Sequence, residues 1–270
     1  MKTILYLLAS DMDGTIIPLD GKPERRAEIH RFTNAFEKQK DAALAYATGR
    51  DLERVLQGMA EWKLPEPDWL ICDVGTSLYH PDADSDRWIL CEAYRKEMKK
   101  QFGGHTADDV AEILQGYPEQ DPSRQTEFKH SYVFPVEDEP EKLLPEIRQK
   151  LQAAGIKAEL VYSVDVYSGE AFLDVLPSGV AKDYAVHFLR NQLQLDTNHV
   201  TYAGDSGNDE HAFKSGINGI VVNNADPKLI GELKAWADTD EKRDRLFFAS
   251  EPFIAGVHEG CRHFGLLPPA

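Results

Sequence analysis

The 270-residue chain is poor in cysteine, and its cysteines follow no metal or redox spacing. Cys72, Cys91 and Cys261 are odd in number and lie far apart, with no CxxC pair among them. This usage argues against a disulfide framework and against a zinc site. We interpret the three cysteines as packing residues with reduced thiols, which is typical of the cytoplasm.

The chain also lacks a long apolar run and an excess of positive charge. No segment approaches the ~20 apolar residues of a membrane-spanning helix. The amino-terminal MKTILYLLAS runs into Asp11 without the cleavage site of a secretory signal. A formal net charge of -16 repels nucleic acid and anionic membranes. We therefore expect a cytoplasmic protein that binds neither, and the absence of coiled-coil heptads favours a monomer.

The apolar residues that are present alternate between strand and helix patterns. Short apolar runs predict strands near residues 5–10, 42–48 and 68–75, and apolar stripes predict helices over 24–39 and 51–61. This order is typical of an α/β fold, a Rossmann-like doubly wound parallel sheet with right-handed crossovers. With 42% hydrophobic residues the chain can bury a full core.

The middle of the chain interrupts this alternation. From about residue 82 to 173 the sequence is more polar and predicts an inserted α+β module with helices near 92–102, 106–115 and 140–153. The α/β rhythm returns afterwards, with helices over 179–193, 227–236 and 253–263 and strands over 199–205 and 217–222. We expect two domains, a core of residues 1–81 and 174–270 and a cap of residues 82–173.

Four short motifs place polar residues where a predicted strand ends or a predicted helix begins. They are DMDGT at 11–15, ATGR at 47–50, SGVAK at 178–182 and GDSGND at 204–209. In a doubly wound sheet such ends converge on one crevice. The crevice would collect the carboxylates of Asp11, Asp13, Asp205 and Asp209, the Thr48 hydroxyl and the cations of Arg50 and Lys182. Clustered carboxylates need a divalent cation, and hard oxygen ligands suit Mg²⁺, the predicted cofactor.

Phosphoryl transfer is the chemistry that fits these groups. Mg²⁺ and Lys182 would neutralise phosphate oxygens while Asp11 attacks phosphorus in line, which gives an aspartyl phosphate. Asp13 could protonate the departing oxygen and later deprotonate water, a role that needs a raised pKa. Thr48 and backbone donors around Gly49 would hold the remaining phosphate oxygens.

Each of these residues also has an ordinary structural explanation. The DMDGT motif could be a turn with solvated carboxylates, because Asp and Gly are common in turns. Asn208 and Asp209 could cap a helix, and Lys182 could be a surface residue in a first helical turn. The occurrence of all four motifs in one chain favours function.

The motifs, in this order, resemble those of the haloacid dehalogenase-like (HAD) phosphohydrolases, and the insert is similar to their larger C2-type (C2B) cap. The resemblance implies that Asp11 is the nucleophile and Asp13 the general acid and base. It implies that phosphate and substrate contact Thr48, Gly49, Arg50, Lys182 and Asn208. The metal ligands it implies are Asp11, the backbone carbonyl of Asp13, Asp205 and Asp209.

Nearly the whole chain is similar to the bacterial sucrose-phosphate phosphatases. The similar stretches are LAYATGR, GTSLYHP, FKHSYVF, FLDVLP, GDSGNDEHAF and VVNNADPKL. The resemblance implies a phosphorylated disaccharide as substrate, sucrose 6-phosphate first, and Lys129 as a cap residue that contacts the sugar. A lone lysine in a strand is otherwise a solvated edge charge. Gly14 stands where those enzymes usually carry Asn or His, and SVDVYSGEAF is longer, so mannosylfructose phosphate is an alternative substrate.

Two further functions stay open. A sugar phosphomutase on the same fold would pass the phosphoryl group to a sugar hydroxyl instead of water. A non-enzymatic sensor, or a subunit that docks on a sugar-phosphate synthase, would bind sugar phosphate without hydrolysing it. The intact pair Asp11 and Asp13 favours an active enzyme, with which docking on a synthase is compatible. His80, His130 and His187 have no ligand spacing and are interpreted as surface or packing residues.

Overall fold

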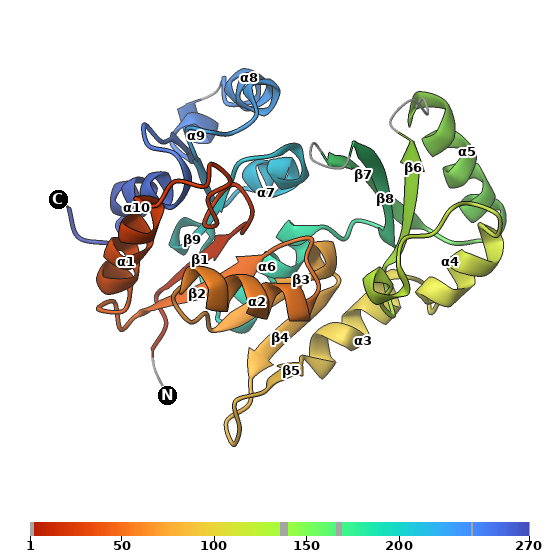
Figure 1. Cartoon of the computed structure of the whole chain (residues 1–270), viewed down its shortest axis with the longest axis horizontal. Coiled ribbons are helices and arrows are strands. Elements are labelled where there is room, and N and C mark those ends of the chain that lie inside the picture. Colours follow the sequence, from red (N-terminus) through yellow and green to blue (C-terminus); the bar gives the residue numbers. More distant parts are fainter. Residues whose placement is uncertain (1–2, 136–139, 166–168, 239, 270) are drawn as a thin grey trace.

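The computed structural model describes residues 3–135, 140–165, 169–238 and 240–269. Within them the chain forms two sheets, one of eight strands and one of three (Figure 1). The order in the larger sheet is β11-β10-β9-β1-β2-β3-β4-β5, and in the smaller one β6-β8-β7. The strands of the larger sheet are β1 (Tyr6–Ser10), β2 (Ala42–Ala47), β3 (Trp69–Cys72), β4 (Ser77–Pro81), β5 (Trp88–Leu90), β9 (Val200–Gly204), β10 (Asn218–Val221) and β11 (Leu246–Phe248).

The first strand lies in the middle of the larger sheet and is buried on both faces. β1 pairs in parallel with β2 and with β9, so that Ala9 lies opposite Ala45 and Tyr202. Because alternate side chains of a strand point to opposite faces, Leu7 and Leu8 join separate hydrophobic clusters. An apolar run in the sequence therefore becomes a central parallel strand.

Helices cover both faces of this sheet (Figure 1). They are α1 (Arg25–Phe36), α2 (Leu52–Trp62), α6 (Lys182–Gln192), α7 (Glu210–Lys214), α8 (Pro227–Trp236), α9 (Asp240–Arg243) and α10 (Phe253–His263). Leu8 packs in one cluster with Phe32 of α1 and Ile254 of α10, whereas Leu7 packs in the other with Leu189 of α6. The predicted doubly wound α/β architecture is confirmed.

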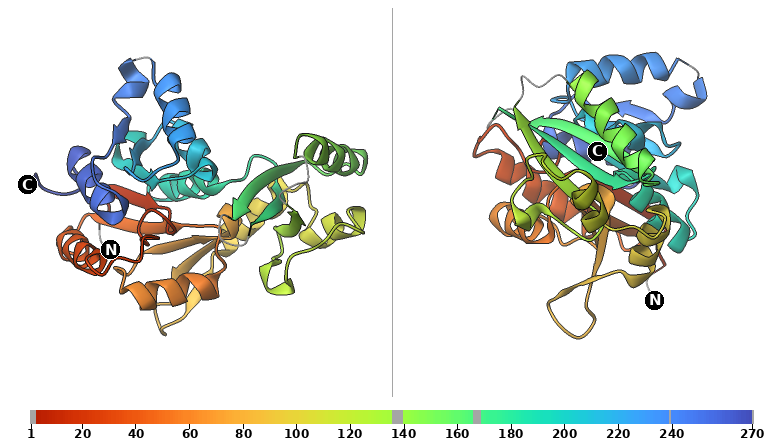
Figure 2. Two further views of the ribbon diagram at one scale, coloured as in Figure 1. Left: turned by 45° about the horizontal axis from the view of Figure 1, so that its top comes forward. Right: turned by 90° about the vertical axis from the view of Figure 1, so that its right-hand side faces the viewer.

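The inserted segment forms the smaller antiparallel sheet and its helices. Its strands are β6 (His130–Pro135), β7 (Ala158–Asp165) and β8 (Glu170–Pro177), and its helices are α3 (Glu92–Gln101), α4 (Ala107–Ile113) and α5 (Pro140–Ala153). Figure 2 shows this part, the cap, standing to one side of the larger sheet. We keep the words core and cap for the parts that carry the larger and the smaller sheet.

The start of the cap differs from the expected residue 82. β5 pairs antiparallel with β4, so residues 88–90 are still part of the larger sheet, and the polar stretch 82–87 connects these two strands. A strand of three residues carries too little pattern to be recognised in a sequence. We therefore propose that the cap begins after β5 and ends with β8.

The cap is joined to the core by the packing of α3 on α6. Tyr94 of α3 is buried, donates a hydrogen bond to the Gly75 carbonyl at 2.6 Å and packs its ring against Phe188 of α6 with centroids 4.9 Å apart. Tyr184 of α6 donates to Glu97 at 2.8 Å. Through these contacts the cap packs directly on one side of the core.

None of the helices in the described ranges is long and apolar enough to cross a membrane.

Candidate active site

Three of the four motifs lie at neighbouring strand ends of the larger sheet. DMDGT follows β1, ATGR ends β2 and GDSGND follows β9, and β9, β1 and β2 are adjacent. The Asp11 N–H donates to the Ala203 carbonyl at 2.9 Å, and the Thr48 N–H donates to the Ile71 carbonyl at 2.9 Å. The fourth motif ends at Lys182, the first residue of α6. Parallel strands thus bring residues from distant parts of the chain to one edge.

Lys182 is buried at the centre of this edge. Its Nζ donates to Asp11 Oδ1 at 2.6 Å, to Asp209 Oδ1 at 2.8 Å and to Asn208 Oδ1 at 3.0 Å. Burial alone would lower the pKa of Lys182, but the carboxylates of Asp11 and Asp209 outweigh it and hold the pKa above its ordinary value. The ammonium group is therefore charged and fixed beside Asp11. This geometry excludes a role as an ordinary surface lysine.

Three carboxylates gather around it. Asp11, Asp205 and Asp209 each offer an oxygen within 4.8 Å of the others. Burial raises the pKa of Asp11 well above its ordinary value, with further contributions from Asp209 and Asp205. Burial and the charge of Asp209 raise the pKa of Asp205 to about 7. One lysine does not neutralise this cluster, so a divalent cation fits the site.

Asp209 is the most enclosed member of the cluster. It is fully buried; its Oδ1 accepts from Lys182 and from the Tyr202 hydroxyl at 2.5 Å, while its Oδ2 accepts from the backbone N–H groups of Asp205 and Ser206 at 3.1 Å each. Both oxygens are thus engaged by protein donors. Asp209 fixes the loop after β9 and holds Lys182 in position.

Asp13 is not one of these three clustered carboxylates and is paired with Arg50. Arg50 Nε and Nη2 donate to the two oxygens of Asp13 at 2.7 and 2.5 Å, a bidentate arrangement. The Thr48 hydroxyl oxygen accepts from the Arg50 N–H at 3.2 Å, and Gly49 lies between them. The side chains of Asp13 and Arg50 are 40% and 27% exposed, so both are accessible from the cavity.

Gly14 allows Asp205 to reach this edge. Its φ of +79° is in the left-handed region, and a Cβ built on it would lie 2.3 Å from Asp205 Oδ2. The Thr15 hydroxyl donates to Asp205 Oδ1 at 2.9 Å. A side chain at position 14 would therefore displace the Asp205 carboxylate.

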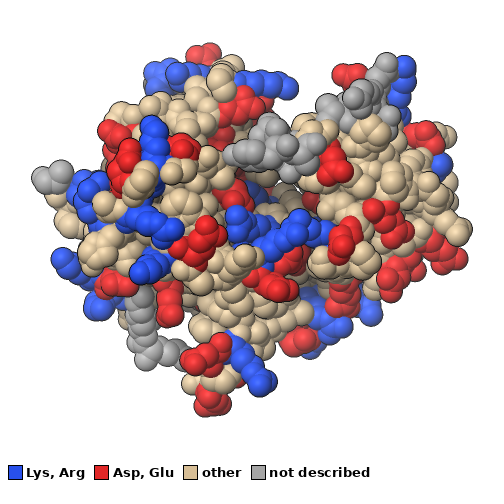
Figure 3. All heavy atoms as spheres, viewed as in Figure 1, with Lys and Arg blue, Asp and Glu red and all other residues tan. Residues whose placement is uncertain are grey.

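A cavity of about 420 Å³ lies above these residues and is lined from both sheets. Its core side includes Asp11, Asp13, Thr48, Gly49, Arg50, Asp205 and Asn208, and its cap side includes Gln120, Arg124, Lys129, Val161, Ser163, Val164, Phe172 and Asp174. Small-molecule sites commonly measure 300–1,000 Å³. Figure 3 shows Lys and Arg side chains gathered where core and cap meet on this face. The cavity lining itself combines the cations of Arg50, Arg124 and Lys129 with the carboxylates of Asp11, Asp13, Asp174 and Asp205.

Lys129 is not the solvated edge charge that a strand lysine usually is. It is 4% exposed, and its Nζ donates to the Arg124 carbonyl at 2.7 Å and to the Ser131 hydroxyl at 2.9 Å. The Ser131 hydroxyl donates to Asp174 at 2.5 Å, and Lys129 Nζ lies 3.8 Å from Asp174. A charged pair of buried Lys129 and partly buried Asp174 therefore lines the cap side of the cavity.

One residue beside the site was missed in the sequence. Asp73, just after β3, is buried, and within the described residues its Oδ1 has no hydrogen-bond partner. Burial raises the pKa of Asp73 to about 6, against the attraction of Lys129. Asp73 and Val74 both have φ in the left-handed region, 54° and 60°. The stretch WLICDVG predicts an apolar strand. The only signal of a buried carboxylate in it is a single acid within an apolar run.

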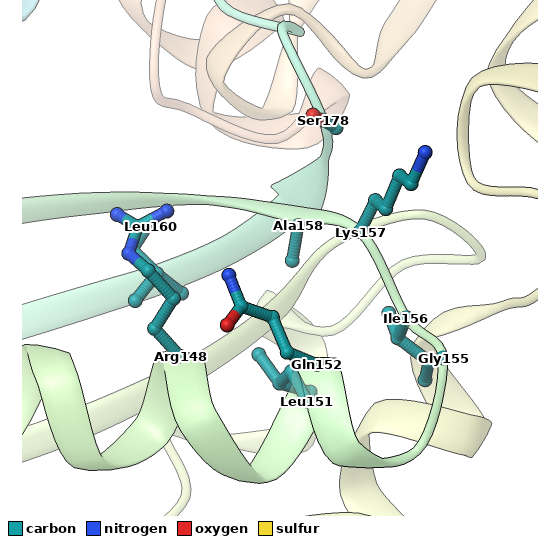
Figure 4. Close-up of a pocket in the computed structure, with 9 residues that line it drawn as sticks. All are labelled: Arg148, Leu151, Gln152, Gly155, Ile156, Lys157, Ala158, Leu160 and Ser178. Atoms are coloured by element: carbon teal, nitrogen blue, oxygen red, sulfur yellow. The ribbon is translucent and has the colours of Figure 1, made fainter.

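A second cavity, of about 440 Å³, lies within the cap (Figure 4). α5 and β7 form its walls, with Leu151 and Ile156 buried beside it and Arg148, Gln152 and Lys157 at its polar side. It shares no lining residue with the cavity above Asp11. The two cavities are therefore separate.

Comparisons with known proteins agree with this assignment. The family model of sucrose-6F-phosphate phosphohydrolase matches residues 4–265. The chain is 32% identical to mannosylfructose-phosphate phosphatase of Agrobacterium fabrum over 98% of both chains. It is 30% identical to glucosylglycerol-phosphate synthase of Pseudomonas anguilliseptica, and there the match covers 97% of this chain and 31% of the synthase. Sucrose-phosphatase 1 of Nicotiana tabacum is 26% identical, with 97% of this chain and 60% of that protein covered.

Solved structures give the same result. The sucrose-phosphatase of Synechocystis, solved with sucrose and phosphate, superposes with a TM-score of 0.78, 25% identity and coverage of 98% of this chain and 99% of that chain. A haloacid dehalogenase-like hydrolase of Bacillus subtilis shares the fold, with a TM-score of 0.68, 17% identity and coverage of 98% and 94%.

Fold, site and comparisons together define a sugar-phosphate phosphatase of the HAD class. The sequence prediction of that class is confirmed. Within it, the chain belongs to the sucrose-6F-phosphate phosphohydrolase family.

Proposed function

We propose that this protein is a Mg²⁺-dependent phosphatase that hydrolyses a phosphorylated disaccharide, sucrose 6-phosphate first, to the free sugar and phosphate. The observation that carries the proposal is the buried contact of Lys182 with Asp11 and Asp209 beneath a cavity lined by both core and cap. A fixed cation beside a desolvated carboxylate is the arrangement that attack on an anionic phosphate requires.

Asp11 is the proposed nucleophile. Its Oδ1 is held by Lys182 at 2.6 Å, which leaves Oδ2 to attack phosphorus in line. The bond from Asp11 to phosphorus forms as the bond from phosphorus to the sugar oxygen breaks, and water then hydrolyses the aspartyl phosphate. Thr48, the Gly49 N–H and Asn208 would bind the phosphate oxygens that Lys182 does not reach.

Asp13 is the proposed general acid and base. It would protonate the departing sugar oxygen and later deprotonate the attacking water. The bidentate contact with Arg50 occupies both carboxylate oxygens of Asp13, so neither is free to reach the sugar oxygen. We therefore propose that an anionic substrate draws Arg50 away from Asp13 and that Arg50 then binds the substrate.

The carboxylate cluster fits Mg²⁺. Asp11 and Asp205, with the backbone carbonyl of Asp13, are the proposed ligands, because both oxygens of Asp209 already accept protein hydrogen bonds. The carboxylate of Asp209 would add to the negative charge around the metal site and would hold Lys182 in position. When bound, Mg²⁺ would neutralise phosphate oxygens during phosphoryl transfer.

The cap is the proposed site of sugar recognition. Lys129 and Asp174 line the same cavity as Asp11, and a paired ammonium and carboxylate can donate to and accept from sugar hydroxyls. Closure of a cap over a phosphate also excludes bulk water. Specificity therefore belongs to the cap side of the cavity, whereas the core supplies the chemistry.

Mannosylfructose phosphate is the second candidate substrate. It is favoured by the 32% identity to a mannosylfructose-phosphate phosphatase, against 25% to the sucrose-phosphatase of Synechocystis. Both candidates are phosphorylated disaccharides that require the same core residues.

We also propose that the protein acts in the cytoplasm as a monomer and docks on a sugar-phosphate synthase. The similarity to a segment covering 31% of a glucosylglycerol-phosphate synthase supports the last point, because a related segment there belongs to the synthase chain itself. Co-purification with a glycosyltransferase from the native host tests the docking, and light scattering of the isolated protein tests the monomer.

The deciding experiment is phosphate release with Mg²⁺ from sucrose 6-phosphate, mannosylfructose phosphate, trehalose 6-phosphate and hexose phosphates, with Asp11→Asn as the blank. We expect one disaccharide phosphate to be hydrolysed far faster than the others and the variant to be silent. Migration of phosphate without release would instead identify a mutase. No turnover of any compound by folded protein with Mg²⁺ would refute the hydrolase.

A further inference from the structure

Helix α2 carries a glycine in its interior that the helix itself does not need. Gly58 is buried in the middle of α2, where alanine would favour the helix more. A Cβ built on Gly58 would lie 2.6 Å from Arg50 Nη1 and 3.1 Å from Ile17 Cδ1. The second distance asks only a small shift of Ile17, whereas the first requires Arg50 to move. The missing side chain therefore leaves room that Arg50 occupies.

The guanidinium group of Arg50 is held in this room from two sides. Its Nη1 donates to the Arg54 carbonyl of α2 at 3.0 Å, and its Nε and Nη2 donate to Asp13 at 2.7 and 2.5 Å. Because the guanidinium is planar and rigid, Nη1 cannot be displaced without moving the other two nitrogens. An alanine at position 58 would therefore disturb the contact with α2 and the pairing with Asp13 together.

The pair of Asp13 and Arg50 belongs to the lining of two cavities. One is the cavity above Asp11. The other measures about 410 Å³ and is lined by Asp13, Arg50, Arg54, Gln57, Gly58 and Glu61. Asp13 and Arg50 are the residues that the two linings share. When Arg50 is displaced from α2, the cavity above Asp11 is therefore open to its side chain.

We propose that Gly58 is a positioning residue for Arg50. Its missing side chain lets Arg50 pair with Asp13 before substrate binds, and so sets how readily Arg50 is released to the substrate. The proposal rests on the proposed function, in which an anionic substrate draws Arg50 away from Asp13. A substrate that must first break these contacts binds more weakly than it would to a protein in which Arg50 is already free. Weakening the resting pair should therefore strengthen substrate binding.

The test compares Gly58→Ala with Gly231→Ala on the disaccharide phosphate that the wild type hydrolyses fastest. Gly231 is the matched control, because it lies in the interior of α8 and nothing is within 4 Å of its Cβ position. Both substitutions favour the helix, but only the first displaces Arg50. A third comparison adds Gly58→Ala to Arg50→Ala, in which there is no guanidinium for the new Cβ to displace.

We expect Gly58→Ala to lower KM about fivefold, with kcat within about twofold of wild type. Gly231→Ala should leave both constants unchanged, and in the Arg50→Ala background Gly58→Ala should change KM by less than about twofold. An unchanged or raised KM for Gly58→Ala, or a fall in KM that persists without Arg50, overturns the proposal. Failure of the proposed function shows separately, as absence of disaccharide phosphate hydrolysis by the wild type.

Discussion

Lys182 is the residue whose environment separates function most clearly from an ordinary structural role. The sequence placed it in a first helical turn and off the apolar face, which fits a surface lysine as well as a catalytic one. In the structure it is 1% exposed and contacts two buried carboxylates. Only the tertiary arrangement of β1, β9 and α6 creates this contact, so the sequence could predict it only from the presence of the other motifs.

Lys182→Met should abolish phosphatase activity and destabilise the fold. The substitution leaves Asp11 and Asp209 buried without their cation, which costs about 3–5 kcal/mol of unfolding free energy. We expect kcat to fall at least ~100-fold. Steady-state kinetics and urea unfolding measure the two effects. The control is Lys228→Met, which removes an exposed pair with Glu232 at 3.9 Å and should change stability by less than about 1 kcal/mol.

Gly14→Ala should reduce the affinity for Mg²⁺. The new Cβ would lie 2.3 Å from Asp205 Oδ2, and the φ of +79° adds backbone strain. Gly21→Ala separates the two causes, because Gly21 also has a left-handed φ, of +66°, but nothing lies within 4 Å of its Cβ position. Because of the left-handed φ, we expect both variants to lose about 1 kcal/mol or more of unfolding free energy. Only Gly14→Ala should need about tenfold more Mg²⁺ for half-maximal activity; equal Mg²⁺ dependence of the two variants would contradict this account.

The turn after β3 shows which local features a sequence pattern does not reveal. Asp73 and Val74 occupy left-handed φ values that L residues avoid, Val most of all because its side chain is β-branched. The turn is held by hydrogen bonds from the Asp73 N–H to the Arg50 carbonyl at 2.9 Å and from the Val74 N–H to the Thr48 carbonyl at 3.1 Å. These partners come from the ATGR motif, so the strained turn supports the proposed phosphate-binding loop.

Asp73→Asn should stabilise the protein above pH 6 and not at pH 4. Burial raises the pKa of Asp73 from 3.8 to about 6, so the folded chain binds this proton more tightly than the unfolded chain. Stability is therefore lost as the pH rises from about 4 to 6. Asn carries no charge and tolerates a left-handed φ. At pH 7.5 we expect a gain of up to ~3 kcal/mol in unfolding free energy.

Urea unfolding of wild type and Asp73→Asn at pH 4 and pH 7.5 measures this difference, and other titrating groups cancel because both proteins contain them. A less stable variant at pH 7.5 would show instead that the charge of Asp73 stabilises the fold through Lys129.

Strand ends were predictable from the sequence, and side-chain pairing was not. The apolar runs before Asp11, before Thr48 and before Asp205 predicted buried parallel strands, and adjacency of those strands followed from the fold class. The pairing of Asp13 with Arg50 depends on two side chains 37 positions apart, which no periodicity encodes. The burial of Lys129 likewise depends on contacts from other parts of the cap, so the sequence around it does not predict whether this lysine is buried or exposed.

At the scale of the whole molecule, core and cap share one hydrophobic cluster. Leu7 and Ala45 of the larger sheet belong to the same cluster as Tyr94 and Met98 of α3 and Leu173 of the cap sheet. Within this cluster α3 packs directly on α6, the helix that begins with Lys182. The helix that positions the cation beside Asp11 is therefore also the helix on which the cap rests.

Thermal unfolding should consequently be a single cooperative transition, although chains of this length often unfold in steps. Because the shared cluster spans both parts, loss of the cap exposes core side chains and destabilises the larger sheet. In scanning calorimetry we expect one peak whose calorimetric and van't Hoff enthalpies agree. Tyr94→Phe leaves the buried Gly75 carbonyl without its donor, which should lower the unfolding free energy by about 1–3 kcal/mol. The midpoint temperature should fall accordingly, while the single peak persists. Two resolved peaks in the wild type would show that the cap unfolds independently and that the α3–α6 contact does not couple it to the core.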